Sequence, residues 1–217
     1  MAIRVLPLLL IFFNALISWG QTPVANSKAV RFNGGFMFGP TLSQIHGDGV
    51  GGFDKYGFHF GIQVKMTSRY KNGIQLSVIY NQKGSRDPAN IQQGNYSSHR
   101  YKLTYFDVPV VYNLNTSFAD FQFGLQPSFL ISAKESIDKL DYTAFLQPEL
   151  HPFDLGVVIG AQKNYGRGST LFTRITQSII PISPVPVLDL PPGVRWNNKM
   201  YNMTLEFGAI ILILPHD

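Results

Sequence analysis

Five histidines are the residues of this chain that could most readily bind a metal or transfer a proton: His46, His59, His99, His151 and His216. None of them forms an HxxxH or HExxH pair, and no paired carboxylates stand beside them at the spacing that metal ligation or acid–base catalysis needs. The chain has no cysteine, which excludes a thiolate nucleophile and a thiolate metal site. We therefore predict no catalytic, metal or cofactor site and a protein that is not an enzyme.

Two other stretches could be mistaken for functional sites. A hydrolytic site could be built from Ser132, Glu149 and His151, but only if the fold brought the three together. The sequence GDGVGG at 47–52 could cradle a phosphate or a calcium ion. It lacks the Lys-Ser/Thr of a P-loop and the spaced acidic ligands of an EF-hand. We interpret both stretches as loop residues in contact with water.

The elements that would position such residues are segments with a period of two. In YGFHFGIQVKM at 56–66, every even-numbered residue is large and apolar and every odd-numbered residue is Gly, His, Gln or Lys. Since successive side chains of a strand point to opposite faces, this pattern predicts a strand with one apolar and one small or polar face. In the fourth segment the apolar parity changes between Tyr105 and Phe106, near Pro109, which indicates a bulge. The chain has eight such segments, beginning near residues 31, 56, 74, 101, 118, 153, 169 and 200.

The connections between the segments alternate in length, long after each odd-numbered segment and short after each even-numbered one. A meandering sheet then gathers long loops at one end and short turns at the other, as in outer-membrane barrels. The alternative, a soluble eight-stranded calyx, would place the large apolar residues inside. A narrow membrane barrel instead suits the Gly, Gln, Asn and Ser of the opposite faces. We predict an all-β, eight-stranded, antiparallel up-and-down transmembrane β-barrel in the outer membrane.

The N-terminus has the composition of a cleaved leader. Arg4 precedes the apolar run VLPLLLIFFNALI at 5–17, and SWG at 18–20 places small residues where a signal peptidase cuts. The alternative is a transmembrane anchor, but the run is short and is interrupted by Pro7 and Asn14. We predict a signal peptide at 1–20, a short leader at 21–30 and a barrel domain at 31–217.

Several segments rich in Gly and aromatic residues are similar to those of a known family. They read GGFMFGPTLSQIHGDGVGGFDKYGFHFGI, NQKGSR, YFDVPVVYNL, FGLQPSFLISAK and DLGVVIGA. They resemble the PorT-like outer-membrane β-barrel proteins of Bacteroidetes-type bacteria, from about Phe32 to Ile213. The resemblance implies an eight-stranded outer-membrane barrel, and one branch of that family is tied to protein secretion across this membrane.

The last segment is also similar to the signal that the outer-membrane insertion machinery recognises, namely a polar residue, a Gly and two spaced hydrophobic residues. Glu206, Gly208, Ile211 and Ile213 stand at those places. Such chains often stop on an aromatic residue, whereas this one continues as LPHD. The motif is short, and any apolar last strand could produce it.

Three charged residues fall on the polar faces of the last three segments, which would be neighbours in the barrel: Asp154, Arg174 and Glu206. A guanidinium stays charged and has only donors, so in a narrow lumen it needs carboxylates. We predict that Arg174 pairs with Asp154, Glu206 or both. The alternative is that strand tilt places these residues at different heights and leaves Arg174 at a water-filled rim.

These observations predict a structural or partner-binding protein with a lumen filled by side chains. Its expected partners are outer-membrane lipid, the insertion machinery during assembly, and secretion-system or other envelope proteins. The basic residues are scattered along the chain, so no nucleic-acid partner is predicted. The alternatives are a small pore or transporter and, with less support, an outer-membrane lipid-modifying enzyme.

Overall fold

The computed structural model describes residues 30–47, 52–68, 71–87, 98–137, 140–142, 150–166, 168–183 and 199–213. The predicted signal peptide and nearly all of the predicted leader lie outside the described residues. The described strands are β1 (Arg31–His46), β2 (Lys55–Thr67), β3 (Gly73–Asp87), β4 (His99–Asp107), β5 (Val110–Asn115), β6 (Asp120–Ile137), β7 (Leu140–Tyr142), β8 (Phe153–Tyr165), β9 (Ser169–Ser178) and β10 (Tyr201–Leu212).

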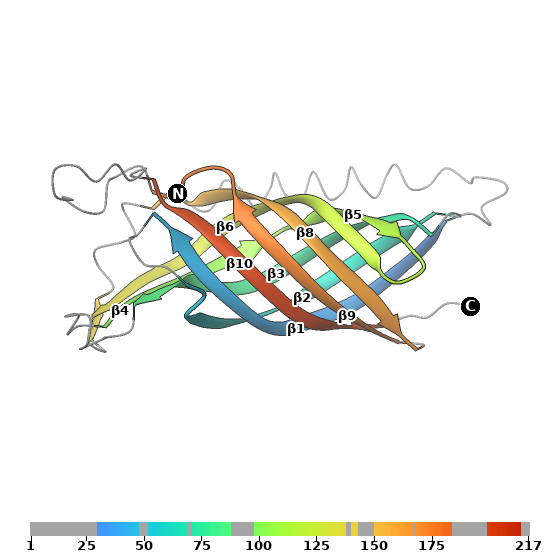
Figure 1. Ribbon diagram of the computed structural model, residues 1–217, viewed down its shortest axis with the longest axis horizontal. Helices are drawn as coiled ribbons and strands as arrows, with labels where there is room; N and C mark the ends of the chain where they lie inside the picture. Colours follow the sequence, from blue (N-terminus) through green and yellow to red (C-terminus); the bar gives the residue numbers. More distant parts are fainter. Residues whose placement is uncertain are drawn as a thin grey trace, which may run out of the picture. The chain divides into compact units, whose positions relative to one another are not determined.

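The strands close into an antiparallel barrel (Figure 1). The sheet runs in the order β2-β1-β10-β9-β8-β6-β4-β3-β5, and pairing between β2 and β3 closes it. β4 and β5 together occupy one strand position in the barrel, since both pair with β3 and β6. The short strand β7 pairs with β6 alone among the described strands. The eight-stranded barrel predicted from the sequence is therefore confirmed. Among the described residues, no helix is long and apolar enough to cross a membrane.

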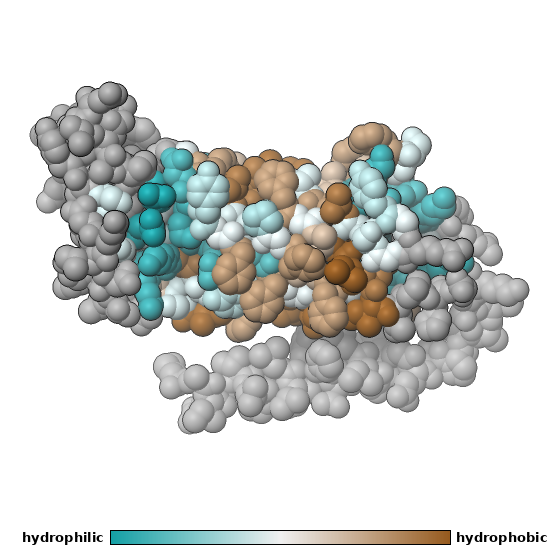
Figure 2. All heavy atoms as spheres, turned by 90° about the horizontal axis from the view of Figure 1, so that it is seen from below, coloured by the Kyte–Doolittle hydropathy of each residue, from teal (hydrophilic) through white to brown (hydrophobic). Residues whose placement is uncertain are grey.

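The large apolar side chains lie on the outside of the barrel. In β2, the even-numbered residues from Tyr56 to Met66 are exposed, whereas Lys55, His59 and Gln63 are buried. The pattern repeats around the wall and gives an apolar belt with hydrophilic side chains toward its two ends (Figure 2). Such a belt is the surface that lipid requires, and closure leaves no strand edge without hydrogen bonds inside it.

The bulge predicted in the fourth segment lies on a different strand. Tyr105 is buried, Phe106 is exposed and Asp107 is buried, so the alternation in β4 is unbroken. The register between β4 and β6 shifts between Thr104 and Tyr105, where β6 contributes the extra residue, Ile131. The prediction was wrong about the strand because the change in apolar parity has another cause: the first residues of β4 send apolar side chains into the lumen.

The wall extends furthest at the end of the barrel that carries the long connections (Figure 1). Beyond Asn81, β3 pairs with β4 alone, and that pairing continues to Asp87 and His99. β6 likewise continues beyond Phe129, where its pairing with β8 stops. We call this extension the flap, formed by residues 82–87 of β3, 99–104 of β4, 132–137 of β6 and all of β7.

Candidate functional site

A hydrogen-bonded network crosses the middle of the lumen, and Asn81 of β3 is its centre. Its Nδ2 donates to Asp107 Oδ2 at 2.9 Å and to Glu206 Oε1 at 2.6 Å, and its Oδ1 accepts from Thr41 Oγ1 at 2.9 Å. The Nζ of Lys83 donates to Asp107 Oδ1 at 2.8 Å. We call these residues, with His59 and Ser128, the central network, which ties together β1, β2, β3, β4, β6 and β10.

A layer of amides lies next to the central network on the side of the short turns. The Nε2 of Gln122 lies 2.7 Å from Asn113 Oδ1, 2.9 Å from Gln162 Oε1 and 3.2 Å from Gln75 Oε1. The Oε1 of Gln122 accepts a 2.7 Å hydrogen bond from Arg174 Nε. All of these side chains are buried, so the layer blocks the lumen a second time.

An ion pair closes the short-turn end of the lumen. Lys65 Nζ lies 2.7 Å from Asp120 Oδ2. The same carboxylate accepts hydrogen bonds from Asn115 and Gln162, which connects it to the amide layer. Side chains from β2, β5, β6 and β8 therefore meet here.

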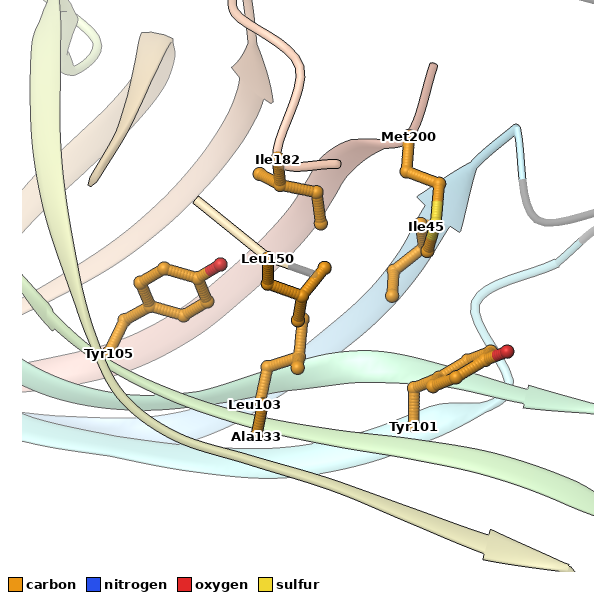
Figure 3. Close-up of a cluster of buried hydrophobic side chains, with 8 residues drawn as sticks. All are labelled: Ile45, Tyr101, Leu103, Tyr105, Ala133, Leu150, Ile182 and Met200. Carbon is orange, nitrogen blue, oxygen red and sulfur yellow. The ribbon is translucent and has the colours of Figure 1, made fainter. Parts of the chain in front are cut away.

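Apolar side chains fill the opposite, long-loop end of the lumen and form a plug made of Ile45, Tyr101, Leu103, Tyr105, Ala133, Leu150, Ile182 and Met200. Figure 3 shows Leu150 and Ile182, which come from outside the strands, pointing toward side chains of the wall. Backbone hydrogen bonds hold these two residues in place, from His151 N to Ile182 O at 2.7 Å and from Ile182 N to Met200 O at 2.8 Å. The plug thus belongs to the barrel wall and to the bases of two long connections.

The three charged residues predicted to form a lumen cluster all point into the barrel, and each is buried. Arg174 and Glu206 are also cross-strand partners. The described part of the chain nevertheless has no ion pair within 4.0 Å at Arg174, and such pairs join Lys65 to Asp120 and Lys83 to Asp107. Arg174 bonds Gln122 and lies over the ring of Phe172, with 4.9 Å from Cζ to the ring centroid. The predicted direct pairing of Arg174 is therefore corrected.

Glu206 and Asp154 have other partners. Glu206 Oε1 bonds Asn81 across the barrel. Asp154 Oδ2 accepts from Ser178 Oγ at 2.7 Å and from Asn202 Nδ2 at 2.9 Å, just below the plug. The alternation along each strand correctly predicted that Asp154, Arg174 and Glu206 point into the lumen. The partner of each one is decided by the direction in which its side chain crosses the lumen. The Lys83–Asp107 pair was missed, although both residues have the polar-face parity of adjacent predicted strands.

The residues of the predicted assembly signal occupy two environments. Glu206 is buried in the central network, and Ile211 and Ile213 are exposed on the outer wall. Gly208 lies under the ring of Phe172, since a Cβ at Gly208 would come within 2.7 Å of two of its ring carbons. Packing in the folded barrel is thus enough to explain why Glu and Gly stand at positions 206 and 208. Recognition of these residues by the insertion machinery stays a prediction.

Of the histidines considered for metal binding or catalysis, His59 is the one that the structure places inside the lumen. His59 is buried in the central network, where Nδ1 lies 3.0 Å from Thr41 Oγ1. No group of three His, Asp or Glu that could hold a metal occurs among the described residues. Glu149, His216 and most of GDGVGG lie outside the described residues.

Comparison with known proteins decides the family. A family model described as an outer membrane protein β-barrel domain matches residues 19–183. The chain belongs to this family. Neisserial surface protein A has a similar structure, with 14% sequence identity and a TM-score of 0.50, and the match covers 84% of this chain and 97% of that one. The outer-membrane location predicted from the sequence is confirmed by the family match together with this fold.

A second solved structure is also similar. It is Ail, the attachment invasion locus protein of Yersinia pestis, in complex with the heparin analogue sucrose octasulfate. It has 13% identity and a TM-score of 0.44, with 84% of this chain and 99% of that chain covered. A search of curated proteins finds no match.

Proposed function

We propose that this outer-membrane barrel is a non-enzymatic, partner-binding component that does not conduct solutes and that acts through its two rims. The single observation that supports this most strongly is the filling of the lumen. The central network, the amide layer and the plug obstruct the axis at three successive heights. Eight strands leave an interior only wide enough for side chains, so a permeation path would need most of these groups to move.

The rims are the parts of the molecule that the membrane does not cover. At the long-loop end the flap extends the wall beyond the strands on the other side of the barrel. At the short-turn end, the aromatic side chain of Phe118 is 73% exposed, and it lies in a turn and not in the strands that carry the apolar belt. Both features offer surfaces to other proteins. The resemblance to PorT-like barrels favours envelope proteins of a secretion apparatus as the class of partner.

This proposal is tested by photo-crosslinking in intact cells. A photoreactive residue replaces Asp54 at the long-loop rim, Phe118 at the short-turn rim, or Ile159 in the apolar belt as a matched control. We expect a protein adduct of one reproducible mass from at least one rim position and none from Ile159, which faces lipid. If the protein is folded in the outer membrane and neither rim position gives an adduct, the result contradicts a partner-binding role.

A further inference from the structure

Basic side chains gather on the outer face of the flap. Arg86, Arg100, Lys102 and Lys134 alternate along their strands with buried residues, so they point away from the lumen. Lys134 is exposed and the other three are half-buried. They lie on β3, β4 and β6, which are adjacent in the sheet. The outer face of the flap is therefore a positively charged surface directly beside the apolar belt.

Like charges stand directly opposite each other on this surface. Arg86 is the cross-strand partner of Arg100, and Lys102 is the cross-strand partner of Lys134. Like charges in such positions destabilise a sheet, because the side chains are held a few ångströms apart. An anion between them would turn this repulsion into attraction. Four cations on adjacent strands are thus arranged to bind an anion that lies between them.

A groove runs along these residues. One part has a volume of about 440 Å³ and is lined by Lys102 and Lys134 together with Tyr80, Gln82 and Ile131. The adjoining part has a volume of about 230 Å³ and is lined by Arg86, Arg100 and Lys102 and by the carboxylate residue Asp54. Both parts share Lys55 and Lys102. The buried Nε of Arg86 has no hydrogen-bond partner among the described residues.

The height of the groove matches the surface of the membrane. Tyr80 and Phe106, whose rings are in edge-to-face contact with centroids 6.4 Å apart, belong to the aromatic residues at this end of the belt. Lys102 lies four residues further along β4 than Phe106. At about 3.3 Å per residue and a tilt of about 40°, this is roughly 10 Å further from the midplane. Headgroups occupy this zone, just outside the hydrocarbon core.

We propose that this groove binds the phosphorylated headgroup of a lipid in the leaflet on the long-loop side. Guanidinium groups bind phosphate oxygens in pairs, and the lysines add charge. Tyr80 and Ile131, which line the groove and also face the belt, would contact the apolar part of the same molecule. This continuity with the belt favours a lipid over a dissolved anion. The site goes beyond the proposed function, because binding of lipid does not require a protein partner.

The test compares two matched triple variants. The first, Arg86→Gln, Arg100→Gln and Lys134→Gln, removes three charges from the groove. The second removes three charges from the short-turn end: Arg31→Gln, Lys71→Gln and Lys163→Gln. Each protein is reconstituted in phosphatidylcholine vesicles that contain a minor fraction of lipid A, a diphosphorylated glycolipid, or of its dephosphorylated form. Native mass spectrometry then measures the lipid A that each barrel retains, and a heat-dependent gel shift verifies folding.

We expect the wild-type protein and the short-turn variant to retain lipid A and to retain little of the dephosphorylated form. The groove variant should retain lipid A about a hundredfold more weakly, since it lacks three basic residues and each of them contributes about fivefold in binding near an anionic surface. Equal retention by the two variants, or equal loss from both, would overturn the site. Competition by inorganic phosphate at an equal phosphate concentration would show a site for free anions and overturn the assignment to lipid.

Discussion

Replacement of Lys83 with methionine is expected to destabilise the folded barrel by about 3–5 kcal/mol, because it leaves a buried carboxylate without its cation. The side chain of Lys83 is 2% exposed, and the side chain of its partner Asp107 is fully buried. Asn81 is the other donor to this carboxylate, and it is already shared with Glu206. The free energy of unfolding in urea, measured in lipid vesicles, gives the size of the loss.

The double variant Lys83→Met, Asp107→Leu is the internal control for this result. It removes both charges together, so it should recover much of the stability lost in the single variant. Lys163→Met is the external control, since Lys163 is exposed at the short-turn end. If Lys83→Met costs no more than Lys163→Met, the central network does not stabilise the barrel in the way described.

Replacement of Ile62 with arginine is expected to cost about 2–4 kcal/mol, the range for a cation at the midplane on the lipid face of a barrel. Ile62 is 55% exposed and lies near the middle of the apolar face of β2. The cost arises because the guanidinium loses water and finds no acceptor in hydrocarbon. The same unfolding measurement applies, in vesicles whose hydrocarbon thickness matches the belt.

Met66→Arg is the matched control, since Met66 has the same parity on the same strand but lies at its short-turn end. A cation there reaches the headgroups and should cost at most about 1 kcal/mol. Equal costs at the two positions would show that depth does not matter, and would contradict the assignment of this face to lipid.

Much of the fold follows from the sequence because a strand in a membrane barrel obeys a strict alternation between two environments. The even-numbered residues of 56–66 could be assigned to the outside from this pattern alone. The extent of the strands was harder to predict. In the first segment the alternation is clear only over RFNGGFMFG at 31–39, yet β1 continues to His46. Beyond Pro40 the inward side chains are Thr41, Ser43 and Ile45, whose mixed polarity carries no clear period.

For the candidate site, the sequence predicts which side chains point into the lumen, but not which of them contact each other. Parity was sufficient to place Arg174 and Glu206 inside the barrel, but the partner of each depends on strand stagger and on the direction in which a long side chain leans. The plug illustrates the second limit. The parity change at Tyr105 and Phe106 predicts a bulge, whereas Tyr101, Leu103 and Tyr105 point into the lumen and form part of the apolar plug. A polar interior gives no reason to expect an apolar end, so the pattern of the sequence does not indicate the plug.

The closed lumen is tested most directly by ionic conductance across planar bilayers. Purified wild-type protein, shown to be folded by its heat-dependent gel mobility, should give no current above that of the bare bilayer. The central network and the plug would both have to open for ions to pass. A large and stable conductance that scales with the amount of folded protein inserted would contradict the closed lumen and the rim-based function derived from it.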